Sequence, residues 1–361
     1  MSDTVRAALA AVVDGRVLSM EDARAAMGSV MDGEATASQL AALLVALRMR
    51  GETVNELAGF AAAMRERVLR VEAPEGAIDV VGTGGDGSGT FNISTTAALV
   101  VAAGGIPVAK HGNRAITSSS GSADVLDALA VRIDHDARSA AAALREYGFA
   151  FLFAPGFHPA MKHAGPTRRE IGVRTAFNLL GPLTNPAGTS RQLLGVGDAA
   201  AAARIAEVAR LLGTERTFVI HGDGVDELPL DGSGVLYDVR PDGVERRTID
   251  ATALGLRRAA TSKLAGGSAT DNARITESIL RGEPGARRDV VLLNAGAAFL
   301  VADAVDSIEA GIERAALTID AGLVLELLER LRAERRAADA VVAETAARAE
   351  SPEAEAQGAR A

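Results

Sequence analysis

Apolar and polar positions follow two different periods along the chain, and the change between them divides the sequence. In residues 1 to about 72, apolar residues recur at the spacing of amphipathic helices. Ser19 precedes two acidic residues in one of these segments, and Gly51 follows the apolar run of another. Such residues are preferred at helix starts and helix ends. Residues 1–72 are therefore predicted to form a small all-helical domain.

From residue 77 onward, short apolar runs alternate with segments of helical character. The runs include "AIDVVG", "IPVAKHG", "FAFLFAP", "QLLGVG" and "RTFVIHG". Strands separated by helices indicate an α/β domain with a mostly parallel central sheet flanked by helices, and such sheets bind ligands beyond the carboxyl ends of their strands. Alternating segments around Pro241, Asp242 and Gly243 predict an antiparallel pair. We expect this domain to span residues 73–350, with a flexible tail at 351–361.

Composition removes several classes of protein. The 361 residues carry a formal net charge of −9, so the chain lacks the basic surface that nucleic acids and anionic membranes attract. There is no cysteine, which excludes disulfides, thiol nucleophiles and cysteine-ligated metals. No signal peptide and no charge-free apolar stretch of about 18 residues is visible. We therefore expect a cytoplasmic protein with no nucleic-acid partner and no membrane partner.

Five glycines stand among the eight residues 82–89, directly after the first apolar run. Their spacing matches G-x-G-x-x-G, but dinucleotide sites also need an acidic residue about 20 positions later, where this chain has Lys110 and His111. A Walker-type loop needs a lysine after its last glycine, and none follows here. A plain turn would need one glycine and one hydroxyl. The loop instead favours an anion bound by backbone N–H groups.

Two later segments are basic. The second strand leads into residues 110–124, whose lysine, arginine, asparagine and serine side chains suit phosphate oxygens, although a solvated basic loop is an alternative. Residues 158–174 form a helix start without an acid before Glu170, which conflicts with the preference of helix N-termini for anions. A bound acidic ligand would resolve this conflict, whereas surface arginines are the alternative. The basic residues of this segment are His158, Lys162, His163, Arg168, Arg169 and Arg174.

An acidic segment, "HGDGVDELPLDG", follows the strand "RTFVI". Its carboxylates repel one another near a cleft of low dielectric unless a cation lies between them. Oxygen ligands beside phosphate groups suit Mg²⁺, while a solvated turn is the alternative for this segment alone. The candidate ligands are Asp223, Asp226, Glu227 and Asp231.

Four motifs in this order resemble the anthranilate phosphoribosyltransferase family: "GTGGDGSGTFNIST", "KHGNRAITSSSGSAD", "RREIGVRTAFNLLGPLTNPAG" and "HGDGVDE". The resemblance covers roughly residues 8–340. It implies transfer of the 5-phosphoribosyl group of phosphoribosyl pyrophosphate to the amine of anthranilate, in tryptophan biosynthesis, with two Mg²⁺ ions per subunit. It also implies a helical domain hinged to the α/β domain, joined in space by about 166–186, and a homodimer formed through the helical domains.

The resemblance also implies roles for single residues. One Mg²⁺ would contact Ser94 and Glu227, and the second would be held by Asp226 and Glu227. No residue is implied as a general base, and Lys110 would act electrostatically. Anthranilate would contact Gly82, Asn113 and Arg168, with Arg168 facing its carboxylate. The phosphoribosyl pyrophosphate site would comprise Gly82, Gly85, Asp86, Thr90, Asn92, Ile93, Ser94, Thr95, Lys110, His111, Gly112, Asn113, Arg114, Ala115, Ile116, Thr117, Ser118 and Ser122.

Two other functions stay open at this point. A pyrimidine-nucleoside phosphorylase of similar fold handles a single phosphate and has less use for paired metal carboxylates. A non-enzymatic relative that binds nucleic acid should be basic and has no need of Asp226 and Glu227. The net charge of −9 and the presence of both acids favour the transferase over either alternative.

Overall fold

A bundle of four helices forms the N-terminal part of the computed structural model, which describes residues 1–115 and 119–349. The helices are α1 (Asp3–Val13), α2 (Met20–Met31), α3 (Ala37–Arg50) and α4 (Val54–Arg65). Each begins after a hydroxyl side chain that accepts a hydrogen bond from the first turn, at Ser2, Ser19, Thr36 and Thr53. Gly51 ends α3 with φ of 90°. The helix starts and stops predicted from the sequence are thus confirmed.

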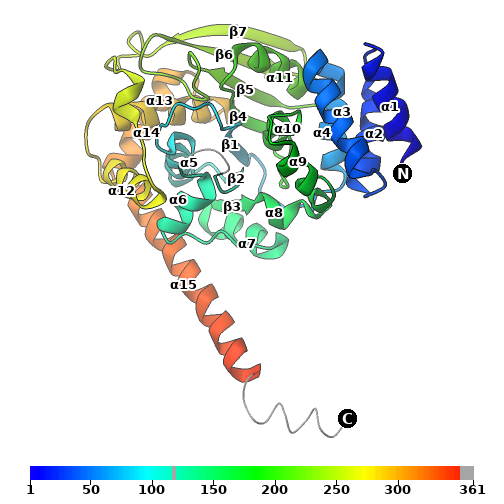
Figure 1. Ribbon diagram of the computed structural model, residues 1–361. Helices are drawn as coiled ribbons and strands as arrows, with labels where there is room; N and C mark the ends of the chain where they lie inside the picture. Colours follow the sequence, from blue (N-terminus) through cyan, green and yellow to red (C-terminus); the bar gives the residue numbers. More distant parts are fainter. Residues whose placement is uncertain (116–118, 350–361) are drawn as a thin grey trace, which may run out of the picture.

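A seven-stranded sheet follows, in the order β3-β2-β1-β4-β5-β6-β7 (Figure 1). Strands β1 to β5 are parallel, and the β6–β7 hairpin continues the sheet in the antiparallel sense. The order reverses between β1 and β4, and such a switch point opens a crevice at the carboxyl ends of the strands. The strands are β1 (Ile78–Gly82), β2 (Val108–Gly112), β3 (Phe149–Phe153), β4 (Arg191–Gly195), β5 (Arg216–His221), β6 (Ser233–Arg240) and β7 (Gly243–Asp250).

Helices cover both faces of the sheet. One core lies between the sheet and α5 (Ile93–Ala103) and α13 (Ala286–Val301); the other joins the opposite face to α11 (Ala199–Leu211) and to the helical bundle. The predicted fold class is therefore confirmed. The remaining α-helices are α6 (Ser122–Ala128), α7 (Ala137–Tyr147), α8 (Ala154–Phe157), α9 (Gly165–Ile171), α10 (Phe177–Leu180), α12 (Ala269–Leu280), α14 (Ile308–Asp320) and α15 (Leu323–Ala349).

Three short 3₁₀ helices complete the described connections: η1 (Pro159–His163), η2 (Gly181–Thr184) and η3 (Thr261–Leu264). Helix α9 packs against α3, and both α10 and η2 pack against α4, so this segment lies beside the helical bundle. The exact domain limits stay a prediction. Within the described ranges, no helix has the length and apolar character needed to cross a membrane.

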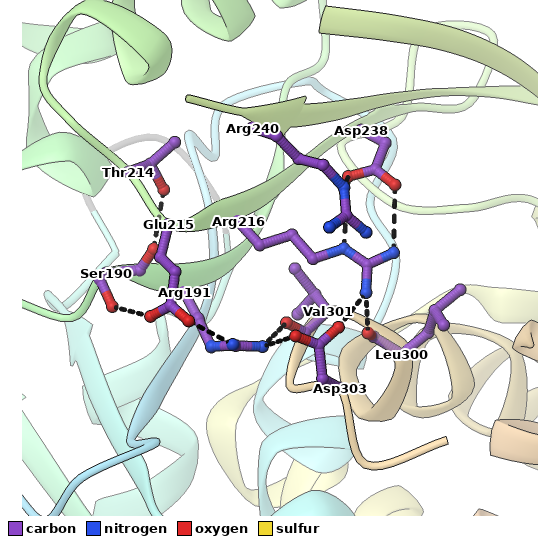
Figure 2. Close-up of polar contacts among 10 residues, drawn as sticks. All are labelled: Ser190, Arg191, Thr214, Glu215, Arg216, Asp238, Arg240, Leu300, Val301 and Asp303. Atoms are coloured by element: carbon purple, nitrogen blue, oxygen red, sulfur yellow. Dashed lines mark hydrogen bonds and ion pairs between the residues drawn. The ribbon is translucent and has the colours of Figure 1, made fainter. Parts of the chain in front are cut away.

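An ionic network fixes the amino-terminal ends of β4 and β5 to the end of α13 (Figure 2). The guanidinium of Arg216 lies 3.1 Å from the carboxylate of Asp238 and donates to the carbonyl of Leu300 at 2.7 Å. Arg191 and Arg216 both pair with Asp303, just after the last turn of α13. Cations at a helix C-terminus are favourable. The ionic network thus occupies the amino-terminal ends of β4 and β5. The carboxyl ends of the strands remain for a ligand.

Gly59 allows α4 to approach α2 closely. A Cβ at position 59 would lie 2.3 Å from the carbonyl oxygen of Met20 and 2.8 Å from the Cβ of Ala23. Since neither atom can move without shifting α2, we expect Gly59→Ala to lower the free energy of unfolding by about 2–3 kcal/mol. Gly28→Ala is the matched control, because its Cβ would approach only the guanidinium of Arg67, at 3.1 Å. Urea unfolding of both variants tests this, and equal stabilities would contradict it.

Candidate active site

The glycine-rich loop connects β1 to α5 at the switch point of the sheet. Gly84, Gly85, Gly87 and Gly89 have φ of 64°, 65°, 77° and 66°, values that other residues adopt only with strain. At Gly82, a Cβ would lie 2.3 Å from the Oδ2 atom of Asp226. The glycines therefore serve two purposes: they allow the left-handed backbone of the loop, and they let a carboxylate approach the end of β1.

Asp226 holds this loop from the β5–β6 connection. Its Oδ2 atom accepts a hydrogen bond from the backbone N–H of Gly84 at 2.8 Å, and its own backbone N–H donates to the carboxylate of Asp86 at 3.3 Å. Burial and repulsion from Asp86 raise the pKa of Asp226 to about 6. Two segments far apart in the chain are thus joined at the carboxyl ends of β1 and β5.

Glu227 is buried and faces the start of α5. Its Oε1 atom accepts a hydrogen bond from the backbone N–H of Ser94 at 2.9 Å. Burial and the neighbouring Asp226 carboxylate raise the pKa of Glu227 well above its ordinary value. Two adjacent acids are therefore kept in a place where their negative charges are unfavourable, and a bound cation would relieve this repulsion.

The carboxylates of Asp226 and Glu227 and the hydroxyl of Ser94 could supply part of the coordination shell of a Mg²⁺ ion. Carboxylate and hydroxyl oxygens are ligands that Mg²⁺ prefers. Among the residues that the structure describes, no group of three or more His, Cys, Asp or Glu side chains is placed to hold a metal ion alone. Mg²⁺ commonly keeps several waters and takes phosphate oxygens from a substrate. The site therefore suits an ion completed by an anionic ligand on the glycine-rich loop.

Lys110 lies in β2 beneath this loop, 1% exposed, and its ammonium group donates to the carbonyl of Val80 in β1. Burial lowers its pKa, while the carboxylates of Asp79, Glu227 and Asp226 act in the opposite direction. Asp79 is fully buried, and burial raises its pKa to about 6. Lys110 thus supplies positive charge below the loop.

Sequence reasoning missed the role of Asp79 and of its partner Asn185. The Nδ2 atom of Asn185 donates to the Asp79 carboxylate at 2.7 Å and to the carbonyl of Ala109 at 2.8 Å. The backbone N–H of His111 donates to the same carboxylate at 3.2 Å. One signal was present in the sequence, since Asp79 is a lone acid inside the apolar run "AIDVVG". A buried acid with these donors fixes β2 against β1.

His111 and His158 form a buried pair, with their Nε2 atoms 3.2 Å apart. Burial, as the largest cause in each case, lowers the pKa of His111 to about 3 and that of His158 to about 4. The side chain of His111 is thus engaged with His158, so any contact with a ligand on the loop has to come from its backbone.

This pair predicts a pH-dependent stability. In the unfolded chain a histidine binds a proton near pH 6.5, whereas folded His158 does so only near pH 4, so stability is lost as the pH falls from 6.5 to 4. We expect His158→Gln to flatten the slope of unfolding free energy against pH in this window. His163→Gln, at an exposed position, is the control and should keep the wild-type slope. Equal slopes in all three proteins would contradict the prediction.

The other predicted donor-site residues fall into four groups, of which the segment after β2 is described separately below. Gly85, Asp86, Thr90 and Asn92 belong to the loop itself. Ile93 and Thr95 have buried side chains in α5, and the backbone N–H of Ile93 donates to the carbonyl of Phe91 at 2.7 Å. Ile116, Thr117 and Ser118 lie outside the described residues.

The segment after β2 is held together internally. Arg114 pairs with Asp124 at 2.9 Å and with Asp127 at 3.3 Å, so its charge is already compensated. The backbone N–H of Arg114 donates to the side chain of Asn113, and the hydroxyl of Ser122 donates to the carbonyl of Asn113 at 3.3 Å. The structure therefore brings Gly112, Asn113 and Ser122 together, next to Ala115.

Arg168 and Arg174 differ in what they contact. Arg168 lies in α9, with its Cζ 4.8 Å from the ring centre of Phe177, and burial lowers its pKa. It forms no ion pair with any described residue, so its charge is available to an acidic ligand. The expected electrostatic conflict at a helix start is not found, because Arg168 and Arg169 lie in the last turn of α9, where cations are favourable. Arg174 donates to the carbonyls of Gly84 and Gly85, a contact with the loop that the sequence did not indicate.

Two of the four acidic candidates lie apart from the pair formed by Asp226 and Glu227. Asp223 and Asp231 line a separate small hollow, and Asp231 forms an ion pair with Arg258 at 2.7 Å. Asp231 is therefore compensated locally, and the paired acids near the loop are the better metal ligands.

Both parts of the chain match a family of glycosyl transferases. The helical bundle domain of that family matches residues 6–68, and its α/β domain matches residues 74–325. The fold and the loop with its paired acids thus define a glycosyl transferase. Anthranilate phosphoribosyltransferase of Thermomicrobium roseum is 49% identical over 90% of this chain and 95% of that relative. The chain belongs to the anthranilate phosphoribosyltransferase family.

Solved structures agree with this. Anthranilate phosphoribosyltransferase from Thermus thermophilus is 44% identical, with a TM-score of 0.87 over 91% of this chain and 99% of the other. The Saccharomyces cerevisiae protein in complex with PRPP and Mg is 26% identical, with a TM-score of 0.85 over 93% of this chain and 99% of that one. Another relative, from Symbiobacterium thermophilum, is 50% identical over 91% of this chain and 97% of its own length.

Proposed function

We infer that this chain transfers the 5-phosphoribosyl group of phosphoribosyl pyrophosphate to the amine of anthranilate, giving N-(5-phosphoribosyl)anthranilate and pyrophosphate in tryptophan biosynthesis. One observation carries the mechanism. Buried Glu227 reaches the first turn of α5 while its neighbour Asp226 binds the glycine-rich loop, so metal-binding acids face an anion-binding turn. Relatives named anthranilate phosphoribosyltransferase, one of them solved in complex with PRPP and Mg, support the two substrates.

Breaking the bond between C1 and the pyrophosphate oxygen develops positive charge on the ribose and negative charge on the leaving group. Backbone N–H groups of the glycine-rich loop that donate to no described residue, such as those of Gly85 and Gly87, and the ammonium of Lys110 stabilise that negative charge. Ser94, Asp226 and Glu227 would hold two Mg²⁺ ions per subunit, which neutralise pyrophosphate charge when bound. The amine of anthranilate attacks with its own lone pair, so the protein contributes mainly by orienting it, and a general base is not needed.

The substrates are proposed to bind to residues that follow the carboxyl ends of β1 and β2, together with Arg168 in α9. Arg168 binds the carboxylate of anthranilate, since its half-buried guanidinium has no carboxylate partner in the described part of the chain. Gly82 and Asn113 contact the same substrate. The donor substrate is bound by Gly82, Gly85, Asp86, Thr90, the residues from Asn92 to Thr95, those from Lys110 to Ser118, and Ser122.

A homodimer formed through the helical bundle is part of the proposal. Val13, Val17, Val45 and Met49, in or next to α1 and α3, are 68%, 58%, 37% and 83% exposed. A second copy of this surface would cover these apolar side chains. We also propose that the protein acts in the cytoplasm. Sedimentation of wild type and of Met49→Asp tests the dimer, which the aspartate should weaken.

Loss of anthranilate fluorescence tests the proposed reaction. The expected result is a loss that requires the protein, phosphoribosyl pyrophosphate and Mg²⁺ together, and that stops when the metal is chelated. Release of free thymine from thymidine and phosphate, without any loss of anthranilate, would instead favour the phosphorylase and overturn the proposal.

A further inference from the structure

A second hollow lies behind the glycine-rich loop, between the loop and the helical bundle. Its volume is about 290 Å³. Arg48 and Glu52 enter it from the bundle, Arg174 from the segment before α10, and Arg204 from α11. None of the residues proposed to bind the metal lines it, although Gly85 and Asp86 form part of its wall. We refer to this hollow as the arginine cavity.

The three arginines of the cavity are not neutralised by carboxylates. Arg48, Arg174 and Arg204 form no ion pair within residues 1–115 and 119–349. Arg204 donates to the backbone carbonyl of Glu52 at 3.3 Å, while its Nε atom is buried without a hydrogen-bond partner. A buried N–H donor without a partner costs free energy, so the cavity favours a ligand that can accept from it.

The acids that line the cavity are mostly engaged elsewhere. Asp198 caps α11 through the backbone N–H of Ala201, at 2.7 Å, and the two oxygens of Asp86 accept from Ser88 and from the backbone of Asp226. The carboxylate of Glu52 accepts no hydrogen bond from the described residues and is 7% exposed. The N-terminus of α11 adds partial positive charge at the same wall. Three arginines and three acids thus line the cavity, and its positive charge lies on guanidinium groups that form no ion pair with a described residue.

We propose that the arginine cavity is a second anion-binding site, for a small organic anion that combines a carboxylate or phosphate group with an O–H or N–H donor. The guanidinium groups would bind the anionic group, because arginine matches planar carboxylates and phosphates. The free Glu52 carboxylate would accept from the donor group. Leu179, Val196 and Ala201 supply an apolar side for the carbon chain. This assignment does not require the reaction proposed above, although Gly85 and Asp86 border both sites.

Crystals soaked in selenate locate the site directly, since selenium scatters anomalously and selenate is a tetrahedral dianion like sulfate. The expected result is an anomalous peak within hydrogen-bond distance of Arg174 and Arg204. A peak confined to the glycine-rich loop near Ser94, or no peak in the cavity, would overturn the proposal.

Calorimetry identifies the class of ligand. The protein is first saturated with phosphoribosyl pyrophosphate and Mg²⁺ without an acceptor, so that the donor site is filled, and is then titrated with inorganic phosphate, glycerol phosphate and glycerate. Arg204→Met should weaken binding about tenfold, as expected for loss of a charge-assisted hydrogen bond. The matched control is Arg210→Met on the same helix, where Arg210 pairs with Glu207 at 2.9 Å.

Each outcome decides the proposal. An organic anion that binds more tightly than inorganic phosphate, and that loses affinity in Arg204→Met but not in Arg210→Met, supports it. Equal affinity for organic and inorganic anions would overturn the assignment to an organic ligand. Equal loss in the two variants would show a general effect of charge and would overturn the site itself.

Discussion

Glu227→Gln is expected to lower kcat/KM by about a thousandfold, since the charge stabilisation that a metal ligand supports is worth several kcal/mol. The amide keeps the size of the side chain but loses the negative charge that faces Ser94 and that is proposed to bind the metal. In the free protein this charge is unfavourable, because burial and Asp226 raise the pKa of Glu227. The variant should therefore unfold at the wild-type temperature or above it, while its activity falls.

Steady-state kinetics at saturating Mg²⁺ and thermal unfolding measure the two effects together. Glu245→Gln on the exposed face of β7 is the matched control and should leave both unchanged. Near-normal turnover in Glu227→Gln would mean that the metal is held elsewhere. A large fall in unfolding temperature would mean that Glu227 is structural.

Arg168→Ala is expected to raise KM for anthranilate about 10- to 100-fold, which corresponds to loss of a hydrogen bond to a charged group. KM for phosphoribosyl pyrophosphate should stay the same, because the donor is proposed to bind at the other end of the site. The guanidinium is half-buried and has no carboxylate partner among the described residues, so its removal should cost little stability beyond the contact with Phe177.

The control for Arg168 is its neighbour. Arg169→Ala removes the same charge from an exposed position of α9 and should leave both KM values near wild type. An altered donor KM with an unchanged acceptor KM in Arg168→Ala would be evidence against the proposed role. Equal effects of the two variants would indicate a long-range effect of charge rather than a contact.

The strands and the loop could be predicted because their signals are local. Each parallel strand is a short apolar run bounded by glycine or by polar residues, and the β6–β7 hairpin has its turn at Pro241 and Asp242. The glycine-rich loop was identified for the same reason. Its left-handed residues have to be glycine, so its conformation is visible in the composition of the segment itself.

Contacts across the sheet could not be predicted from local pattern. The bond from Gly84 to Asp226 joins residues 142 positions apart and depends on the strand order, in which only β4 separates β1 from β5. The pair of His111 and His158 and the contact of Arg174 with the loop depend on the same topology. The sequence indicated which residues carry charge, but only the fold determines which charges meet.

The central helix α13 illustrates another limit. Its residues from Val290 to Val301 are all buried, so the helix has no polar face and its sequence shows no amphipathic period. A segment of this kind resembles a long apolar run until its neighbours are known. The pattern does not show that this segment is a helix buried on all sides. That follows only from the fold, in which α5 and α14 pack against it.

The order of the strands also bears on how copies of this chain meet. Strand β7 lies at one end of the sheet, and an unpaired edge strand is a template for adding strands from other molecules. Three consecutive charged residues, Glu245, Arg246 and Arg247, are exposed along this edge. Such charges discourage a second strand from docking, so the edge is protected against aggregation. Addition of strands from other molecules is therefore disfavoured at this end of the sheet.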